Sequence, residues 1–179
     1  SGIGIYVIDA DGSNQTQLTD EEELSWNPSW SPDGLKIAYK SRSIHEIWVM
    51  DADGSNQTLL MTSEFGLGYH SWSPVLNDYT EKIAFGLARD GNWEIYEMDA
   101  DGSSQTNLTN NSANDKSPSW SPDGSQIVFQ SDRDGNSEIY VMDADGSNQM
   151  NLTNSSEGDY TPSWSPDGSK IVFQSDRDG

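Results

Sequence analysis

The stretch from Ser117 to Ser147 reads S-P-S-W-S-P-D-G-S-Q-I-V-F-Q-S-D-R-D-G-N-S-E-I-Y-V-M-D-A-D-G-S, and it decides the fold. Three Asp-Gly pairs in it separate short runs of apolar and β-branched residues. Asp-Gly between such runs favours a tight hairpin turn, because glycine accepts a positive φ and aspartate tolerates one. Three turns predict four antiparallel strands. We expect these strands, called A to D, near residues 117–120, 126–130, 138–143 and 149–153.

Two motifs recur along the chain with the same spacing. Trp-Ser-Pro begins at Trp30, Trp72, Trp120 and Trp164. Asp-Ala-Asp-Gly begins at Asp9, Asp51, Asp99 and Asp143, so both motifs step by 42, 48 and 44 residues. A shared period of this size indicates one supersecondary unit copied along the chain, and propeller blades are among the few candidates. The four tryptophans at the end of strand A are expected to pack in the core between blades.

Length variation is expected at the hairpin tips. The first copy shortens its B–C turn to Ser41-Arg42-Ser43, and the second copy replaces Pro-Asp-Gly by residues 74–78. Surface turns tolerate such changes better than strands do. The sequence therefore predicts an all-β fold in which residues 1–179 form a single β-propeller of four four-stranded antiparallel blades.

Composition excludes several classes of function. The 179 residues include no cysteine, 30 Asp and Glu and only 9 Lys and Arg, which gives a formal net charge of −21. A disulfide framework is therefore excluded, and nucleic acid is not expected as a partner because phosphate contacts need clustered basic side chains. No apolar run approaches the roughly 18 residues of a membrane helix, so no membrane insertion is expected. No signal peptide is visible at Ser1-Gly2-Ile3-Gly4.

The repeated string S-P-D-G-x-x-I-x-F-x-S-D-R-D-G-x-x-x-I-Y-x-M-D-x-D-G resembles the TolB-type propeller repeat, which is also described as WD40-like. The resemblance covers nearly the whole chain and is strongest in the third and fourth copies. It implies that strand A lines the central axis and strand D lies at the rim. Family members usually build rings of six or more blades, and the family implies a bacterial protein with a periplasmic or extracellular location.

The expected function is a non-enzymatic module that binds a protein, a peptide or a glycan. The alternative is the substrate-binding propeller of a larger peptidase or polysaccharide lyase, because the repeat also occurs in such enzymes. A fold of this kind hosts many functions, so the function must be argued from a site.

No catalytic or metal site is expected from the motifs. The sequence has no G-x-S-x-G elbow and no H-E-x-x-H, and His45 and His70 stand at non-equivalent points of two repeats. The segment Asp9-Ala-Asp-Gly-Ser-Asn14 and its copies leave calcium open as an alternative, because alternate oxygens can converge on a hard cation. The spacing departs from an EF-hand loop, since glycine is fourth and the twelfth position carries no glutamate. Hairpin chemistry accounts for the Asp-Gly pairs, so no cofactor is expected.

A binding site is predicted where the repeats differ from one another, because a scaffold needs repetition and a site needs difference. These departures cluster just before strand A, on the face that carries the B–C turns with Arg42, Arg89, Arg133 and Arg177. The candidate ligand-binding residues are Trp26, Tyr69, His70, Asp115, Lys116, Asp159 and Tyr160, which the propeller arrangement would place around the axial opening.

The two ends of the sequence carry complementary strands. Ile5 opens a strand C, whereas Gly179 ends the turn that follows a strand B. Pairing of these strands would remove open sheet edges. Either one chain closes as a four-bladed ring, or two chains exchange ends in a homodimer with eight blades. A ring of four needs a turn of about 90° between blades, and larger family rings need about 45–60°, so the dimer is favoured.

Overall fold

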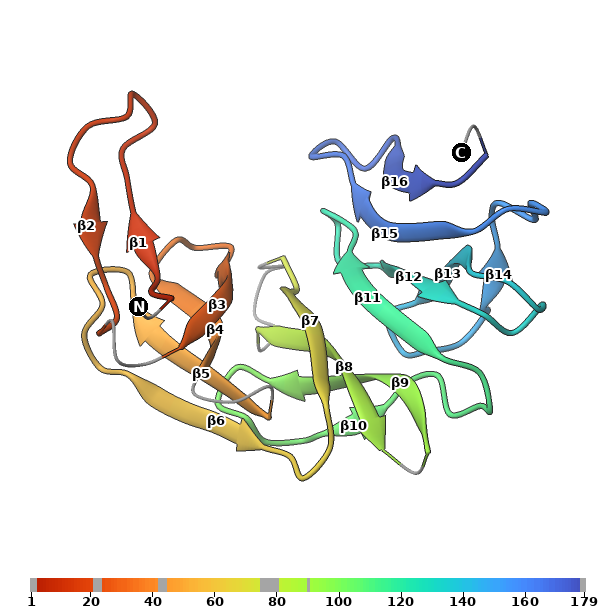
Figure 1. The fold of residues 1–179 in the computed structure, drawn as a ribbon, viewed down its shortest axis with the longest axis horizontal. Helices are drawn as coiled ribbons and strands as arrows, with labels where there is room; N and C mark the ends of the chain where they lie inside the picture. Colours follow the sequence, from red (N-terminus) through yellow and green to blue (C-terminus); the bar gives the residue numbers. More distant parts are fainter. Residues whose placement is uncertain (1–2, 21–23, 42–44, 75–80, 90, 178–179) are drawn as a thin grey trace. The chain divides into compact units, whose positions relative to one another are not determined.

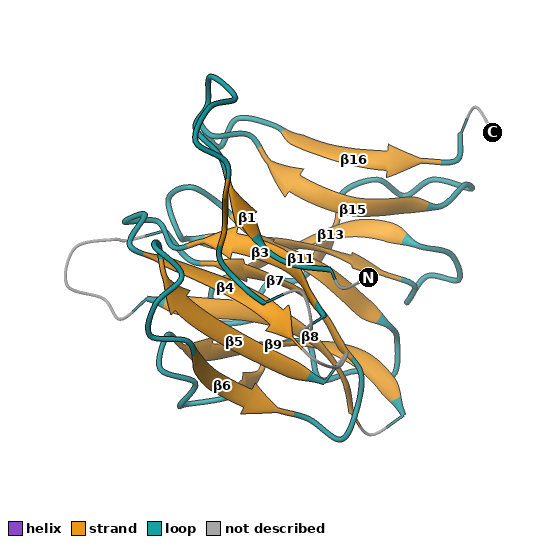
Figure 2. Ribbon diagram, turned by 60° about the vertical axis from the view of Figure 1, so that its left-hand side comes forward, coloured by secondary structure: helices purple, strands orange, loops and turns teal. Residues whose placement is uncertain are grey.

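The computed structural model describes residues 3–20, 24–41, 45–74, 81–89 and 91–177. Every secondary-structure element in these residues is a β-strand (Figure 2). The chain divides into two compact units, Ser1–Glu64 and Phe65–Gly179, and each unit has its own sheets.

The first unit contains a two-stranded sheet and a four-stranded sheet (Figure 1). The two-stranded sheet pairs β1 (Tyr6–Val7) with β2 (Thr16–Gln17). The four-stranded antiparallel sheet has the order β3 (Ser25–Trp30), β4 (Lys36–Ser41), β5 (Glu46–Asp51) and β6 (Thr58–Thr62). Its buried core joins both sheets through Ile5, Leu18, Ile37, Tyr39 and Met50.

The second unit contains two four-stranded sheets and a two-stranded sheet. The first sheet consists of β7 (Leu67–Trp72), β8 (Lys82–Arg89), β9 (Asn92–Asp99) and β10 (Thr106–Asn107). The second consists of β11 (Asp115–Trp120), β12 (Gln126–Ser131), β13 (Glu138–Asp143) and β14 (Met150–Asn151). The third pairs β15 (Asp159–Trp164) with β16 (Ile171–Ser175).

The four-stranded antiparallel blade predicted from residues 117–147 is confirmed. The sheet β11-β12-β13-β14 follows the expected order of strands A to D, although strand A begins earlier, at Asp115, and strand D is shorter than expected. The predicted turn glycines adopt positive φ, with 66° at Gly124, 107° at Gly135 and 85° at Gly146. Arg42 and residues 75–78 of the altered turn lie outside the described residues.

Within the described residues, the strands form three complete blades and two half blades. By position in the repeat, β1 and β2 are strands C and D, whereas β15 and β16 are strands A and B. Pairing between these half blades, the number of blades in a closed ring and the eight-bladed homodimer stay predictions.

The tryptophans at the end of strand A are not all buried, which corrects the expectation for Trp30. Trp72 is 7% exposed and Trp120 is 8% exposed, but Trp30 is 49% exposed. Trp120 belongs to a buried cluster with Ala84 of strand B and Ile95 of strand C in the preceding blade. The half blade that precedes β3 has no strand B among the described residues, so the equivalent cover over Trp30 is missing.

Neighbouring blades of the second unit share one hydrophobic core. The buried cluster combines Leu108 and the residues just named with Ile127, Phe129, Tyr140 and Met142 of the next blade. The Phe129 and Tyr140 rings lie 5.8 Å apart between centroids. Because both sheets supply the apolar faces, this packing places β11 beside β7, and β15 lies against β11 in the same way.

The turns between strands A and B hold their aspartates in the charged form. Ser165 donates a hydrogen bond from Oγ to Oδ1 of Asp167 at 2.6 Å, and the backbone N of Ser169 donates to the same oxygen at 3.0 Å. The Ser165 bond, followed by the bonds from Ser169, lowers the pKa of Asp167 from 3.8 to about 2.

We therefore expect the Asp167 carboxyl to titrate near pH 2 in the folded protein, as followed by carbon-detected NMR. A pKa below the unfolded value means that this carboxylate stabilises the fold above pH 3.8 and that the contribution is lost as the pH falls towards 2. The double variant Ser165→Ala, Ser169→Ala should return the pKa towards its usual value. A normal pKa in the unchanged protein would contradict the hydrogen-bonding scheme.

Candidate binding pocket

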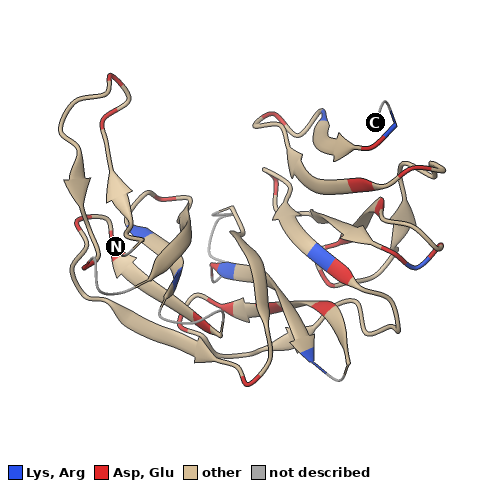
Figure 3. Ribbon diagram, viewed as in Figure 1, with Lys and Arg blue, Asp and Glu red and all other residues tan. Residues whose placement is uncertain are grey.

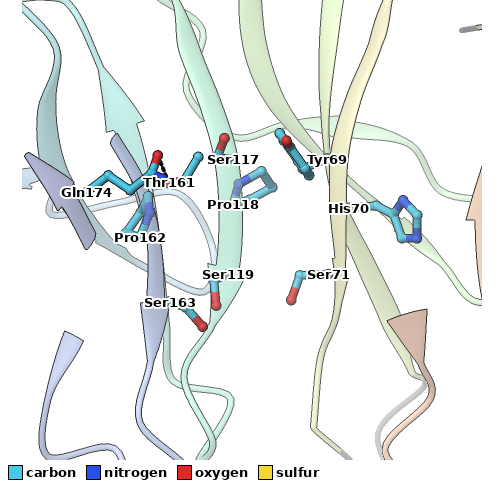
Figure 4. A pocket seen from close by; sticks show the side chains of 10 residues that line it. All are labelled: Tyr69, His70, Ser71, Ser117, Pro118, Ser119, Thr161, Pro162, Ser163 and Gln174. Carbon is cyan, nitrogen blue, oxygen red and sulfur yellow. Dashed lines mark hydrogen bonds between the residues drawn. The ribbon is translucent and has the colours of Figure 1, made fainter. Parts of the chain in front are cut away.

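A cavity of about 460 Å³ lies among the three A strands of the second unit. Figure 4 shows its lining, which comes from the middle of β7, β11 and β15 and from β16. The ten lining residues are Tyr69, His70, Ser71, Ser117, Pro118, Ser119, Thr161, Pro162, Ser163 and Gln174. Strands from three blades therefore meet at one pocket, as expected for strand A at an axis.

β-Bulges shape two of the strands that line the pocket, β11 and β15. The register shifts between Lys116 and Ser119 in β11 and between Tyr160 and Ser163 in β15. Inside these bulges, Ser117 has a φ of 55° and Thr161 has a φ of 48°. A β-branched residue at positive φ is costly, and such strain is concentrated at functional sites.

Hydrogen bonds hold part of the lining in place. The Thr161 hydroxyl donates to Oε1 of Gln174 at 3.1 Å, and the Thr161 backbone N donates to Oε1 of Gln130 at 3.4 Å. The Ser71 hydroxyl accepts a bond of 3.4 Å from the Trp120 backbone N. These contacts tie the lining of β15 to β12 and β16, and the lining of β7 to β11.

Buried glutamates anchor the links that lead from each strand D into the next strand A. Glu94 is 5% exposed and accepts bonds from the Asn111 backbone N at 2.9 Å and from Asn92 at 2.8 Å. In the next blade Glu138 is 2% exposed and accepts a bond of 2.7 Å from the Ser155 backbone N. A buried carboxylate needs such partners, so each glutamate holds the link from strand D to the following strand A.

The pocket is uncharged although the chain is strongly acidic. None of the ten lining residues is Asp, Glu, Lys or Arg. The carboxylates lie mainly in turns, and Figure 3 shows how far they outnumber the Lys and Arg positions along both units. The pocket therefore offers hydroxyl, amide and phenol groups within an overall negative field.

Two of the predicted site residues line the pocket. Tyr69 is 55% exposed, whereas His70 is partly buried and its ring points away from the other labelled side chains (Figure 4). Trp26 is in β3 of the first unit, and the pocket belongs to the second unit. Its role as a ligand contact stays a prediction.

Asp115 and Asp159 are not available to a ligand, which corrects their predicted role. Both side chains are completely buried. Arg133 donates to Asp115 Oδ1 at 3.2 Å, and Arg177 donates to Asp159 Oδ2 at 2.6 Å. Burial opposes ionisation of Asp159, but hydrogen bonds from Ser175, Arg177 and Thr153 outweigh it and lower its pKa. These carboxylates hold the B–C turns against the start of strand A.

Lys116 and Tyr160 stand next to the lining without belonging to it. The Lys116 Nζ lies 5.5 Å from the centroid of the Trp93 ring, and the Tyr160 hydroxyl donates to Oδ2 of Asp176 at 3.1 Å. The Trp93 indole packs against Gly66, Gly68 and Gly86. A Cβ added at Gly66 or Gly68 would lie only 3.2 Å from the indole. Lys116 thus contributes to this packing beside the pocket.

The lining residues that sequence reasoning missed are mainly the repeated serines and prolines. Ser71, Ser119 and Ser163 occupy equivalent positions in three A strands and face one pocket. Their repetition indicated scaffold, yet an axis collects equivalent residues from every blade. The available signal was their position in the strand, because each serine follows two residues after Tyr69, Ser117 or Thr161, within or directly after the variable segments that suggested the site.

The described residues contain neither a cluster of metal ligands nor a helix that could cross a membrane. Within them, no group of three or more His, Asp or Glu side chains is arranged to hold a metal ion. Asp9 Oδ2 instead accepts a bond of 2.7 Å from Asn14, and Asp11 Oδ1 accepts one of 2.6 Å from the Ser13 hydroxyl. No helix among the described residues is long and apolar enough to cross a membrane.

Solved structures with the same fold include two TolB proteins. TolB from Acinetobacter baumannii is 28% identical with a TM-score of 0.78, and the match covers 94% of this chain and 42% of that chain. A putative TolB from Agrobacterium tumefaciens is 24% identical with a TM-score of 0.66, covering 96% and 77%. The chain thus spans well under half of the Acinetobacter protein.

An oligogalacturonate lyase from Vibrio parahaemolyticus is 18% identical with a TM-score of 0.75, and the match covers 98% of this chain and 53% of that chain. Identity this low shows the shared fold alone. The family described as TolB beta propeller domain matches residues 2–150. The chain therefore belongs to the TolB beta propeller domain family.

Proposed function

We propose that this chain is a non-enzymatic binding module that holds a protein, peptide or glycan ligand in the pocket between β7, β11 and β15. The observation that carries the proposal is the 460 Å³ cavity, whose lining combines exposed Tyr69 with strained Ser117 and Thr161. Its volume lies within the roughly 300–1,000 Å³ of typical ligand pockets. Strained residues persist only where the surrounding structure holds them, so the lining is preorganised.

The chemistry of the lining supports binding rather than catalysis. Serine hydroxyls and His70 are present, but none of the ten lining residues is a carboxylate that would orient a histidine as a general base. The net charge of −21 disfavours nucleic acid as the ligand. We further propose a periplasmic or extracellular location and a function without a cofactor, in line with the TolB resemblance.

The alternative is that the chain serves as the substrate-binding propeller of a larger peptidase or polysaccharide lyase. The observation that favours this alternative is the fold that the chain shares with oligogalacturonate lyase. The complete gene distinguishes the two proposals, because a catalytic domain encoded beside the propeller would favour the enzyme.

Substitution of Tyr69 by alanine tests the binding module. We expect ligands selected from a displayed peptide library and a glycan array to lose about tenfold or more in affinity, since exposed tyrosines in pockets are frequent hot spots. Tyr6→Ala is the matched control, because Tyr6 is 47% exposed on β1 in the other unit, whereas Tyr69 is 55% exposed. Biolayer interferometry gives the affinities. Ligands that bind both variants as tightly as the unchanged protein would refute the pocket assignment.

A further inference from the structure

The pocket contains hydroxyl groups that the protein leaves unused. Among the described residues, the Oγ atoms of Ser117, Ser119 and Ser163 have no hydrogen-bond partner. Figure 4 shows Ser119 and Ser163 on neighbouring A strands, with Ser71 on the third strand across the pocket. Each hydroxyl can donate one bond and accept two, and it rotates to suit its partner. The lining therefore matches a ligand that is itself rich in groups that both donate and accept.

The A strands that line the pocket are poorly suited to pairing with an extended peptide. β7, β11 and β15 are edge strands of their sheets, and an exposed edge is where a peptide would add a strand. Bulges interrupt these edges, and Pro118 and Pro162 remove a backbone donor inside two of them. Proline and bulges are the features by which proteins block strand addition. The lining also lacks the arginine cluster used to bind phosphorylated or acidic peptides.

Charge further restricts the ligand. An acidic ligand would find no Lys or Arg in the lining, and burying a carboxylate without a partner is costly. Arg133 and Arg177 are already engaged by buried Asp115 and Asp159. The overall charge of −21 would also repel an anion approaching the pocket. A cationic ligand would likewise find no Asp or Glu in the lining to pair with, so the ligand that fits is uncharged.

An apolar surface completes the pocket. Tyr69 is 55% exposed, and aromatic rings of this kind present a flat apolar face together with a polar hydroxyl. A sugar ring has the matching combination of a C–H face and an equatorial belt of hydroxyls. Gln174 adds an amide whose Oε1 is held by Thr161, while its Nε2 donates no bond among the described residues.

We propose that the pocket binds an uncharged glycan, through Ser71, Ser119 and Ser163 as hydrogen-bonding groups and Tyr69 as the ring-stacking surface. This inference rests on the proposed binding function and names its ligand class. It predicts binding that does not weaken at high salt, because no ion pair contributes.

The test compares neutral and acidic saccharides on the same protein. The neutral probes are cello-, malto-, manno-, xylo- and N-acetylchito-oligosaccharides, and oligogalacturonate is the acidic probe. Saturation-transfer NMR and calorimetry measure binding. We expect at least one neutral oligosaccharide to bind with an affinity that is unchanged by salt. The double variant Ser119→Ala, Ser163→Ala should lower that affinity at least tenfold. Ser112→Ala is the matched control, because Ser112 is an exposed serine outside the lining.

The outcomes separate this inference from the proposed function. Binding of oligogalacturonate alone, or of a displayed peptide that depends on Tyr69 while every neutral saccharide fails, overturns the glycan inference and keeps the binding module. Failure of saccharides and peptides alike to show Tyr69-dependent binding overturns both. Melting curves of the serine variants should match the unchanged protein, since the replaced hydroxyls have no partner within the described structure.

Discussion

Replacement of Arg133 by alanine is expected to lower the free energy of unfolding by about 3–5 kcal/mol, because it leaves a buried carboxylate without its cation. The Asp115 side chain is 0% exposed, and Arg133 is its ion-pair partner at 3.2 Å. The guanidinium also lies 4.4 Å from the Tyr140 ring centroid and donates to Gln149 at 2.7 Å. One substitution therefore removes an ion pair, a cation–π contact and a hydrogen bond between two loops.

Two further variants separate these contributions. Arg133→Lys keeps the positive charge but loses the planar fork, so it should fall between the unchanged protein and Arg133→Ala. Lys36→Ala breaks the ion pair with Asp51, whose side chains are 47% and 35% exposed, and should leave the urea midpoint nearly unchanged. Urea titrations followed by circular dichroism measure all three. Equal midpoints for Arg133→Ala and Lys36→Ala would contradict the structural role of the buried pair.

Replacement of Gly146 by alanine is the second large effect, and we expect a loss of about 2–5 kcal/mol from backbone strain and steric overlap together. Gly146 has a φ of +85°, and an added Cβ would lie 2.6 Å from the Leu108 carbonyl oxygen and 3.1 Å from Leu108 Cα. The obstacle is backbone rather than a flexible side chain. That carbonyl also accepts a hydrogen bond of 3.2 Å from Gln149, so it cannot move without losing a partner.

Gly168→Ala is the control for backbone strain alone. Gly168 has a φ of +69°, but the nearest neighbour of an added Cβ is Pro122 Cδ at 3.6 Å, which is an ordinary contact. Its expected cost is about 1–2 kcal/mol, the usual penalty of a left-handed conformation. The difference between the two urea midpoints isolates the overlap with Leu108. A loss for Gly146→Ala no greater than that for Gly168→Ala would show that the link around Leu108 moves freely.

The strands and turns were predictable because their causes are local. The Asp-Gly pair at Asp145-Gly146 predicts a turn from two neighbouring residues, and the apolar, β-branched and aromatic run between Glu138 and Asp143 predicts a strand. The same local rules could not predict the burial of Trp30. Its exposure depends on whether a neighbouring sheet supplies a strand B, which lies far away in the sequence.

The candidate site was only partly predictable. Sequence differences between repeats pointed to the start of strand A and found Tyr69 and His70 in the pocket lining. They also selected Asp115 and Asp159, which are buried by arginines 18 residues later in the chain. A carboxylate beside a variable loop looks accessible until its long-range partner is known.

The sequence by itself determined the repeat, the four-stranded blade, the turn chemistry and the acidic charge, since each follows from residues close together in the chain. The tertiary structure decided which groups are left for a ligand. Ser71, Ser119 and Ser163 look like identical scaffold residues in separate repeats, and they become one site only because packing brings three A strands together. Shape and burial at a pocket are sums over distant residues, so local patterns do not contain them.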